Sequence, residues 1–186
     1  MAIDSFIGDI YSGLQAMTLS KVDRYYANDC LVILSGLYGV LRPLDGVHPY
    51  RLEMGYKFPD IPYNNLYQFW SDRLAQALPQ DRTIINTSSA EYTKAIFPYL
   101  PNARIITPKF LTVSPVTHEP TFVTVHAKIA RGAFARWLIR NRIEDEASLR
   151  NFSELGYRYD PARSTKGEPA FVARTFKGVG LSIRLS

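Results

Sequence analysis

The stretch Leu31-Val32-Ile33-Leu34-Ser35-Gly36-Leu37-Tyr38-Gly39-Val40-Leu41-Arg42-Pro43-Leu44-Asp45 joins an apolar run to a glycine-bearing turn and a polar loop. The continuous apolar run at 31–34 predicts a short strand that is buried on both faces. Glycine directly after such a strand frees backbone N–H groups to face a ligand and allows the close approach that an anion requires. The loop after this strand is therefore the first candidate for a functional site.

The composition is typical of one globular domain. Of 186 residues, 46% are hydrophobic and 21% are charged, and a chain of this length favours a single domain over residues 1–186. The formal net charge is +5 at pH 7, and this excess favours polyanionic partners such as nucleic acid or nucleotide phosphates. No segment approaches the roughly 20 apolar residues of a membrane span, and no signal peptide pattern opens the chain. We therefore expect a cytoplasmic protein that does not contact a membrane.

The residues that usually hold metals and cofactors are sparse. Cys30 is the only cysteine, and its place before the apolar strand favours a buried, inert thiol over a redox sensor. His48, His118 and His126 lie in separate predicted elements without the spacing of a metal site. The loop lacks the glycine patterns that bind ATP or NAD. The sequence therefore predicts neither a metal nor a cofactor.

Hydrophobic periodicity predicts alternating helices and strands. Helices are expected over 6–27, with a restart at a Ser20 cap, and over 65–78, 88–97, 127–142 and 145–152. Further strands are expected over 83–86, 103–107 and 170–176, with 110–116 and 121–125 paired as a hairpin. Because strands and helices alternate early and a hairpin comes late, we expect an α/β (α+β) protein, a single domain with a mixed β-sheet flanked by helices.

The polar loop after the first strand carries side chains suited to an anion. Arg42 and Arg51 offer planar, permanently charged forks for phosphate or carboxylate, and Asp45 and Glu53 could orient these forks. The alternative is a structural loop in which the same residues pair with one another and with backbone carbonyls.

A second junction between a strand and a helix occurs at Asn86-Thr87-Ser88-Ser89-Ala90-Glu91-Tyr92. The free N–H groups and the dipole of a helix start favour anions, and two such junctions in one mixed sheet are expected to face the same crevice. Lys94, one turn into the helix, would add positive charge there. An ordinary helix cap with a capping glutamate is the alternative interpretation.

The predicted helix over 127–142 is the most basic segment of the chain. No acidic residue interrupts it before Glu144, which is typical of a surface that follows phosphates, although a solvated helix face also carries arginines. Its basic side chains are Lys128, Arg131, Arg136, Arg140 and Arg142. Phe134 and Trp137 of the same helix are expected to be core anchors.

Several of these motifs carry a family resemblance. The loop at 34–45, together with Pro49-Tyr50-Arg51-Leu52-Glu53-Met54-Gly55, resembles the YaaA family of peroxide stress resistance proteins. The resemblance extends over nearly the whole chain in the order that the family shows. The further matches are Gly8-Asp9-Ile10-Tyr11-Ser12-Gly13-Leu14-Gln15, Leu66-Tyr67-Gln68-Phe69-Trp70, Asn86 with Ser89-Ala90-Glu91-Tyr92, Ala127-Lys128 with Ala130-Arg131-Gly132, and Gly156-Tyr157.

The resemblance implies a cytosolic bacterial protein that helps cells to survive hydrogen peroxide by limiting iron-mediated damage to DNA. It also implies a YaaA-like α/β fold and DNA binding through a positively charged cleft with a helix-hairpin-helix element, and no secure catalytic activity. Family members usually begin with a strand and several tens of residues of helix before the segment that matches 6–9. We therefore expect an N-terminally shortened YaaA-like domain over 1–186, with an exposed edge that a second copy of the chain could cover.

Two hypotheses from different functional classes follow. In the first, the chain binds DNA, single- or double-stranded, through a cleft that joins the cations of the loop and the basic helix. In the second, it is an enzyme that acts on a small phosphorylated or nucleobase-like ligand in the same crevice, with Glu53 or Glu91 as acid or base. The residues predicted to contact nucleic acid or another anion are Ser35, Gly36, Tyr38, Gly39, Arg42, Arg51, Asn86, Ser89, Lys94, Lys128 and Arg131.

Overall fold

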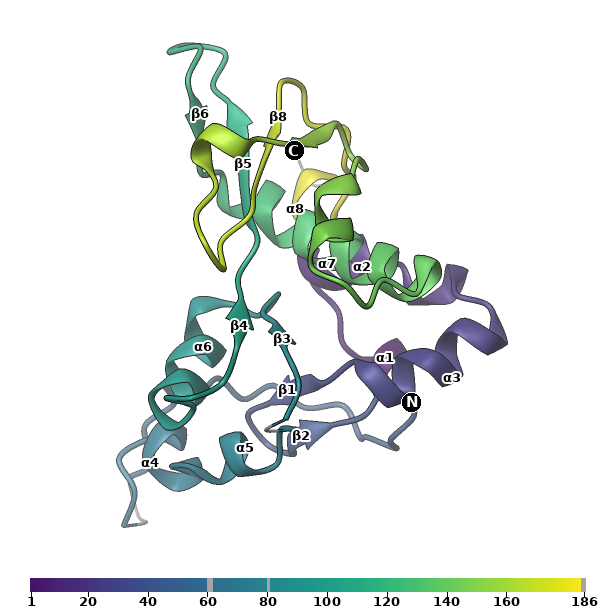
Figure 1. The fold of residues 1–186 in the computed structure, drawn as a ribbon. Coiled ribbons are helices and arrows are strands. Elements are labelled where there is room, and N and C mark those ends of the chain that lie inside the picture. The colour runs from purple at the N-terminus through teal and green to yellow at the C-terminus, as the bar shows by residue number, and fades with distance from the viewer. Residues whose placement is uncertain (60–61, 80, 185–186) are drawn as a thin grey trace.

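Helix α7 (Thr124–Asn141) lies between the N-terminal helix α2 (Asp9–Leu14) and the largest sheet (Figure 1). The two helices touch backbone to backbone. A β-carbon on Gly132 would lie 1.8 Å from the carbonyl oxygen of Ile10, and one on Gly13 would lie 1.9 Å from the carbonyl oxygen of Ile129. Glycine is required at both positions because any side chain would force the two backbones apart.

The computed structural model describes residues 1–59, 62–79 and 81–184. Its N-terminal part is divided into short helices where the periodicity predicted one helix from 6 to 27. Gly8 and Gln15 both have positive φ, 136° and 46°, and each ends the helical backbone on one side of α2. The predicted restart at Ser20 is confirmed, because Ser20 and Asp23 form a capping box. The helices of this part, besides α2, are α1 (Ala2–Ser5), η1 (Ala16–Thr18) and α3 (Lys21–Cys30).

The largest described sheet has four strands in the order β6-β5-β8-β7. Strands β5 and β8 are parallel, with Phe110 beside Phe171, and the outer pairs are antiparallel. The sheet is therefore mixed, as predicted, and the expected hairpin of β5 and β6 is confirmed. The second strand of this hairpin, β6, is shorter than the expected 121–125 because α7 already begins at Thr124. The strands are β5 (Lys109–Val113), β6 (Pro120–Thr121), β7 (Tyr157–Tyr159) and β8 (Ala170–Ala173).

Two smaller sheets contain the strands that lead into the candidate site. Strands β1 (Ile33–Ser35) and β2 (Gly39–Leu41) form an antiparallel hairpin, and β3 (Ile84–Ile85) pairs in parallel with β4 (Ile105–Ile106). The expectation of a strand buried on both faces at 31–34 is wrong. Leu34 is only half-buried, because β1 belongs to a two-stranded hairpin and not to the middle of a large sheet.

The remaining helices are short. The predicted helix over 65–78 is split in two, because Ser71 has a φ of 49°, and the predicted helix over 145–152 is a 3-10 turn. These elements are α4 (Leu66–Trp70), α5 (Arg73–Gln76), α6 (Ala90–Ile96), η2 (Phe97–Tyr99), η3 (Ala147–Asn151), η4 (Pro161–Arg163) and α8 (Leu181–Arg184). Helices and mixed sheets together confirm the predicted α/β class.

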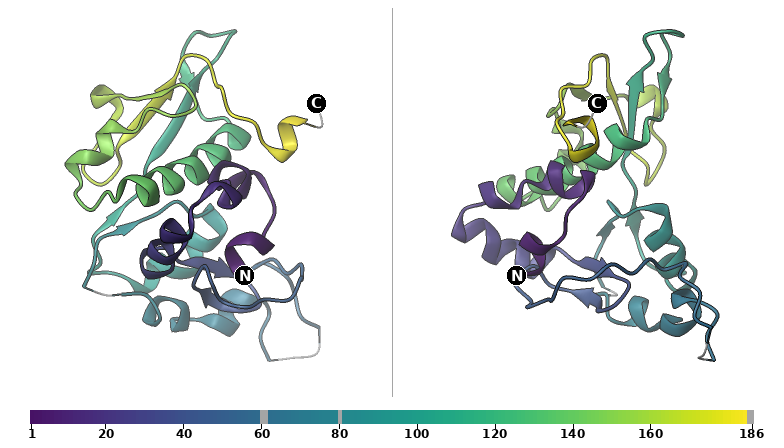
Figure 2. Two further views of the ribbon diagram at one scale, coloured as in Figure 1. Left: turned by 90° about the vertical axis from the view of Figure 1, so that its right-hand side faces the viewer. Right: turned by 180° about the vertical axis from the view of Figure 1, so that it is seen from behind.

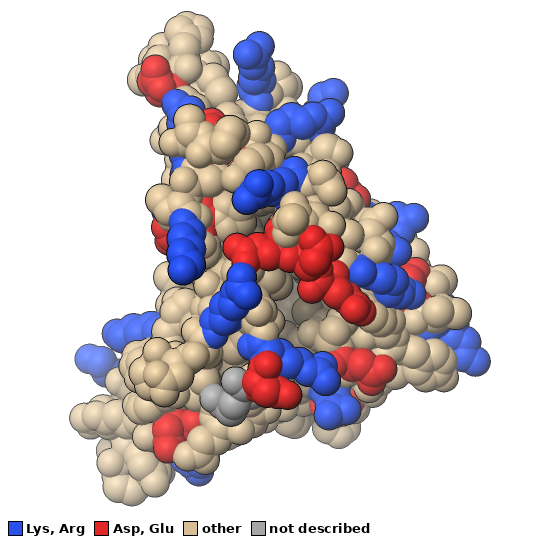
Figure 3. Space-filling view, viewed as in Figure 1, with Lys and Arg blue, Asp and Glu red and all other residues tan. Residues whose placement is uncertain are grey.

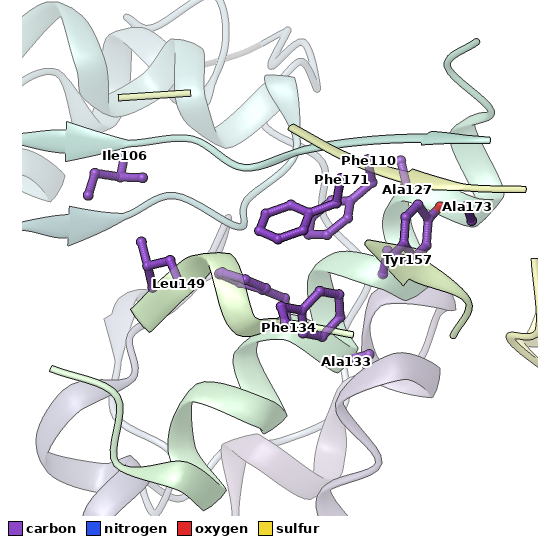
Figure 4. Packing of buried hydrophobic residues seen from close by; sticks show 11 residues of the cluster. Ile106, Phe110, Ala127, Ala133, Phe134, Leu149, Tyr157, Phe171 and Ala173 are labelled. Carbon is purple, nitrogen blue, oxygen red and sulfur yellow. The ribbon is translucent and has the colours of Figure 1, made fainter. Parts of the chain in front are cut away.

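Aromatic side chains fill the core between α7 and the four-stranded sheet (Figure 4). Phe110 stacks on Phe171 with ring centroids 5.5 Å apart, and Phe134 meets Phe152 edge to face at 5.0 Å. Each buried ring contributes about 1.5–3 kcal/mol from burial alone. Phe134 is fully buried and Trp137 packs against the same cluster, so the predicted core role of both residues is confirmed.

Cys30 is exposed at the end of α3, so the expectation of a buried thiol is wrong. Helix α3 ends at this residue, and the buried part of the following strand begins only at Ile33. The surrounding protein still removes enough water to raise the pKa of the thiol above its ordinary value. The reactive thiolate is therefore disfavoured.

A bidentate ion pair fixes the N-terminal helices, and it makes stability depend on pH. Arg24 donates from both terminal nitrogens to the carboxylate of Asp4, at 2.8 and 2.9 Å, and this holds the pKa of Asp4 below its ordinary value of 3.8. The stabilisation is therefore complete above the unfolded pKa and is lost as pH falls through the lower folded pKa. We expect Asp4→Asn to cost about 2 kcal/mol at neutral pH. Urea unfolding should show this cost shrinking near pH 3, and an unchanged cost would contradict the ion pair's role.

Candidate nucleic-acid interface

The turn between β1 and β2 is organised around the buried hydroxyl of Ser35. Its Oγ accepts a hydrogen bond from the backbone N–H of Tyr38 at 2.9 Å and also contacts the hydroxyl of Tyr50. The rings of Tyr38 and Tyr50 meet edge to face, with centroids 5.6 Å apart. Because Ser35 and Tyr38 both contact Tyr50, the loop that follows β2 returns to the β1–β2 turn.

The two glycines of this turn make room for neighbouring groups. A β-carbon on Gly36 would lie 2.7 Å from the carbonyl oxygen of Leu52, and one on Gly39, where φ is 78°, would lie 2.8 Å from the ring of Trp70. The indole N–H of Trp70 donates to the carbonyl oxygen of Gly36 at 2.8 Å. The structure thus gives both glycines a packing role, and contact of their N–H groups with an anion stays a prediction.

The second junction is held by the buried side chain of Asn86. Its amide nitrogen donates to the hydroxyls of Thr93 and Thr107, both at 3.3 Å, and its oxygen accepts from the backbone and the hydroxyl of Ser88. The amide is therefore satisfied within the protein. Ser89 occupies the predicted N-cap of α6, although its side chain makes no capping hydrogen bond.

The two junctions lie together, as expected, although their strands belong to two separate two-stranded sheets and not to one mixed sheet. The carboxylate of Glu91 accepts the backbone N–H of Met54 at 2.6 Å. Burial, followed by the nearby Tyr50, raises the pKa of Tyr92 to about 12. The second junction therefore contacts the later part of the loop through Glu91, and Tyr92 lies near Tyr50 of the same loop.

Four tyrosines surround this meeting point, and we call them the tyrosine cluster: Tyr11, Tyr38, Tyr50 and Tyr92. Phe6 links them, since its ring stacks on Tyr11 at 5.6 Å and meets Tyr50 at 6.1 Å. Burial also raises the pKa of Tyr11, with further contributions from Tyr92 and Tyr50. Sequence reasoning missed Tyr11, Tyr50 and Tyr92 as site residues, because at helical spacing or in a loop they resemble ordinary core aromatics.

The loop arginines project into solvent. The guanidinium of Arg42 forms no ion pair with a carboxylate among the described residues, because Asp45 accepts the backbone N–H of Arg42 at 2.7 Å instead. Arg51 pairs with Glu53 at 3.6 Å, with 92% and 72% of the two side chains exposed. An exposed pair of this kind is worth little, so both arginines stay free to bind an external anion.

Lys94, Lys128 and Arg131 also lack an ion pair with any carboxylate that the structure describes. Lys94 lies over the ring of Tyr67 at 5.0 Å, and Lys128 is exposed near the start of α7. Arg131 is half-buried, and burial lowers the pKa of its guanidinium. It lies one turn before Ala135, which packs in the cluster that holds Ile33, and residues four apart share a helix face. Arg131 therefore projects from the face of α7 that packs toward the N-terminal helices.

The second half of α7 differs from the first. Arg136 pairs with Glu154 at 2.7 Å, and Arg142, which follows α7, pairs with Asp23 at 2.8 Å. The acidic partners come from other parts of the chain, which local sequence could not reveal. Arg136 and Arg142 are therefore engaged within the fold, whereas phosphate contact by Lys128 and Arg131 stays a prediction.

The face of the molecule in Figure 3 has mixed charge. Lysine and arginine side chains alternate there with acidic ones, and acidic side chains gather near its centre. The segment after β2, which carries the loop arginines, crosses the opposite face (Figure 2, right). The face drawn in Figure 3 therefore shows no continuous basic surface among the described residues.

The two glutamates proposed as acid or base both have partners within the fold. Glu53 is exposed and pairs with Arg51, and Glu91 accepts the backbone N–H of Met54. A catalytic role for either residue stays a prediction.

Among residues 1–59, 62–79 and 81–184, no three side chains of His, Cys, Asp or Glu gather in a way that could hold a metal ion. Within the same residues, no helix combines the length and the apolar character needed to cross a membrane.

The fold and the loop define an α/β protein with a polar, arginine-bearing loop after its first hairpin. The chain belongs to the family described as peroxide stress protein YaaA, whose family model matches residues 1–163, so the resemblance seen in the sequence is confirmed and a general role in oxidative stress is supported. A UPF0246 protein of Salinispora tropica is 57% identical over 98% of this chain and 70% of its own length. UPF0246 proteins of Roseobacter denitrificans and Marinomonas sp. are 44% and 42% identical over 90% and 92% of this chain and 67% and 66% of their own lengths.

Proposed function

We propose that this chain is a cytoplasmic DNA-binding protein of the peroxide stress response, and that its loop arginines and the first half of α7 contact the phosphates. We also propose that the protein protects DNA against iron-mediated damage, and this part is supported by the family resemblance. The proposed DNA contact is supported by the structure of the loop and of α7.

A single observation carries the proposal. Four of the five cations predicted to contact phosphate make no ion pair with a described carboxylate, and the fifth, Arg51, makes only an exposed one at 3.6 Å. In contrast, Arg136 and Arg142 of the same basic region are paired within the fold. A half-buried guanidinium such as that of Arg131 is costly without an anion beside it. A phosphate would supply that anion.

The geometry favours a polyanion over a small substrate. Arg42 and Arg51 lie on an exposed loop, whereas Arg131 lies on a helix that packs against another part of the molecule. Cations spread over separate elements match the repeated charges of a DNA backbone, since phosphates recur along the whole strand. A small ligand would need convergent polar groups in a closed pocket.

The experiment measures binding of a fluorescein-labelled duplex of about 20 base pairs at low salt, where phosphate contacts are strongest. We expect saturable binding that excess unlabelled duplex reverses and that millimolar nucleoside monophosphate leaves nearly unchanged. Displacement by the mononucleotide at low concentration would instead support the enzyme hypothesis. Absence of duplex binding by the folded chain would overturn the proposal.

A further inference from the structure

A row of aromatic rings ending in an arginine lies on and beside helix α4. The ring of Tyr63 meets Phe69 edge to face with centroids 5.5 Å apart, and Phe69 meets Trp70 at 5.1 Å. The guanidinium of Arg73 lies 4.8 Å from the ring centroid of Phe69 and 5.7 Å from that of Trp70. We call Tyr63, Phe69, Trp70 and Arg73 the aromatic row.

The outer part of this row faces solvent. Tyr63 is 37% exposed, Phe69 is half-buried and Arg73 is exposed. Arg73 donates from Nε to the carbonyl oxygen of Trp70 at 3.3 Å and forms no ion pair with a carboxylate in the part of the chain that the structure describes. Exposed rings beside an uncompensated cation form a surface with both apolar and positive character.

The row is fixed to the loop of the proposed DNA interface. Trp70 donates its indole N–H to Gly36 at 2.8 Å, and its ring lies against Gly39. Strand β2 leads from Gly39 directly to Arg42, a span of about 10 Å at the usual rise of a strand. The aromatic row is therefore joined to the start of the loop through Trp70 and strand β2.

We propose that Tyr63, Phe69 and Arg73 stack against unpaired bases, so that the chain recognises single-stranded DNA by its bases as well as by its phosphates. This inference rests on the proposed DNA binding. Aromatic rings and arginine planes bind the faces of bases, and these faces are accessible only where the strand is unpaired. A duplex should therefore use the loop cations but not the aromatic row.

The experiment compares three fluorescein-labelled probes of equal length: a mixed-sequence single strand, a strand of abasic sites with the same phosphates, and the duplex. Because stacking is worth about 1–3 kcal/mol per base, we expect the base-bearing strand to bind about 10-fold more tightly than the abasic strand. Tyr63→Ala should remove most of this difference and leave duplex binding unchanged. Tyr63→Phe, which keeps the ring, should retain it.

Tyr25 supplies the matched control, since it is 56% exposed and Lys21 lies over its ring at 5.9 Å, but it lies on α3. Tyr25→Ala should keep the preference for base-bearing strands. Equal affinity for base-bearing and abasic strands, with duplex binding intact, would overturn the stacking surface and leave the proposed function standing. Failure to bind any of the three probes would overturn the proposed function and the stacking surface together.

Discussion

Gly132→Ala should destabilise the protein by about 3 kcal/mol, at the upper end of the usual cost of overpacking. The added methyl group would lie 1.8 Å from the carbonyl oxygen of Ile10 and 2.6 Å from the backbone nitrogen of Leu14. Both atoms belong to a backbone held by helical hydrogen bonds, so neither can move without shifting α2 against α7. Urea unfolding followed by circular dichroism measures the change in the free energy of unfolding.

Gly46→Ala is the matched control, because no heavy atom lies within 4 Å of a β-carbon built there. We expect its unfolding midpoint to stay close to that of the wild type. If Gly132→Ala were as stable as Gly46→Ala, the close contact of α2 and α7 would be wrong.

Removing the unpaired cations should weaken duplex binding strongly. The variant Arg42→Gln, Arg51→Gln, Lys128→Gln and Arg131→Gln removes four phosphate contacts of the proposed interface, and we expect an affinity loss on the order of 100-fold at low salt. None of these side chains holds the fold through a strong ion pair, since among the described residues only Arg51 has a carboxylate partner and that pair is exposed. Fluorescence anisotropy with the labelled duplex measures the loss.

A second four-site variant distinguishes the loss of cations at the proposed interface from the loss of net charge alone. Arg104, Lys109 and Arg163 form ion pairs within the fold, and Arg158 donates to backbone carbonyls. Changing all four to glutamine lowers the net charge by the same amount as the first variant. We expect it to retain most of the affinity. Equal losses in both variants would mean that DNA responds to overall charge and not to the proposed interface.

The fold was predictable where the signal is local. Ser20 predicts a helix start, and the capping box that it forms with Asp23 confirms it. The α/β class follows from the alternation of helices and strands in the sequence. The breaks within predicted helices were not predictable, because Gln15 and Ser71 have positive φ although neither residue type signals it. The β1–β2 hairpin was also missed, since apolar periodicity alone cannot show that Val40 and Leu41 pair back on Leu34 and Ile33.

The candidate site was predicted in outline. The meeting of the two junctions followed from their shared place at strand ends, and contacts of Glu91 with the loop confirm it. The pairing state of the cations was invisible in the sequence, because Glu154 and Asp23 are far along the chain from α7. The aromatic row was hidden for a similar reason, since the contact of Trp70 with Gly36 joins residues that are 34 positions apart.

The measurement that tests the central claim most directly is the salt dependence of duplex binding by the wild type and by the variant of Arg42, Arg51, Lys128 and Arg131. The slope of log K against log salt counts the phosphates that a protein neutralises, at about −0.9 for each contact. We predict a wild-type slope of about −4.5 for the five proposed contacts and a variant slope of about −1, since Lys94 remains and each lost phosphate contact removes about one unit. Equal slopes in the two proteins would show that these cations do not contact the phosphates and would contradict the proposed interface.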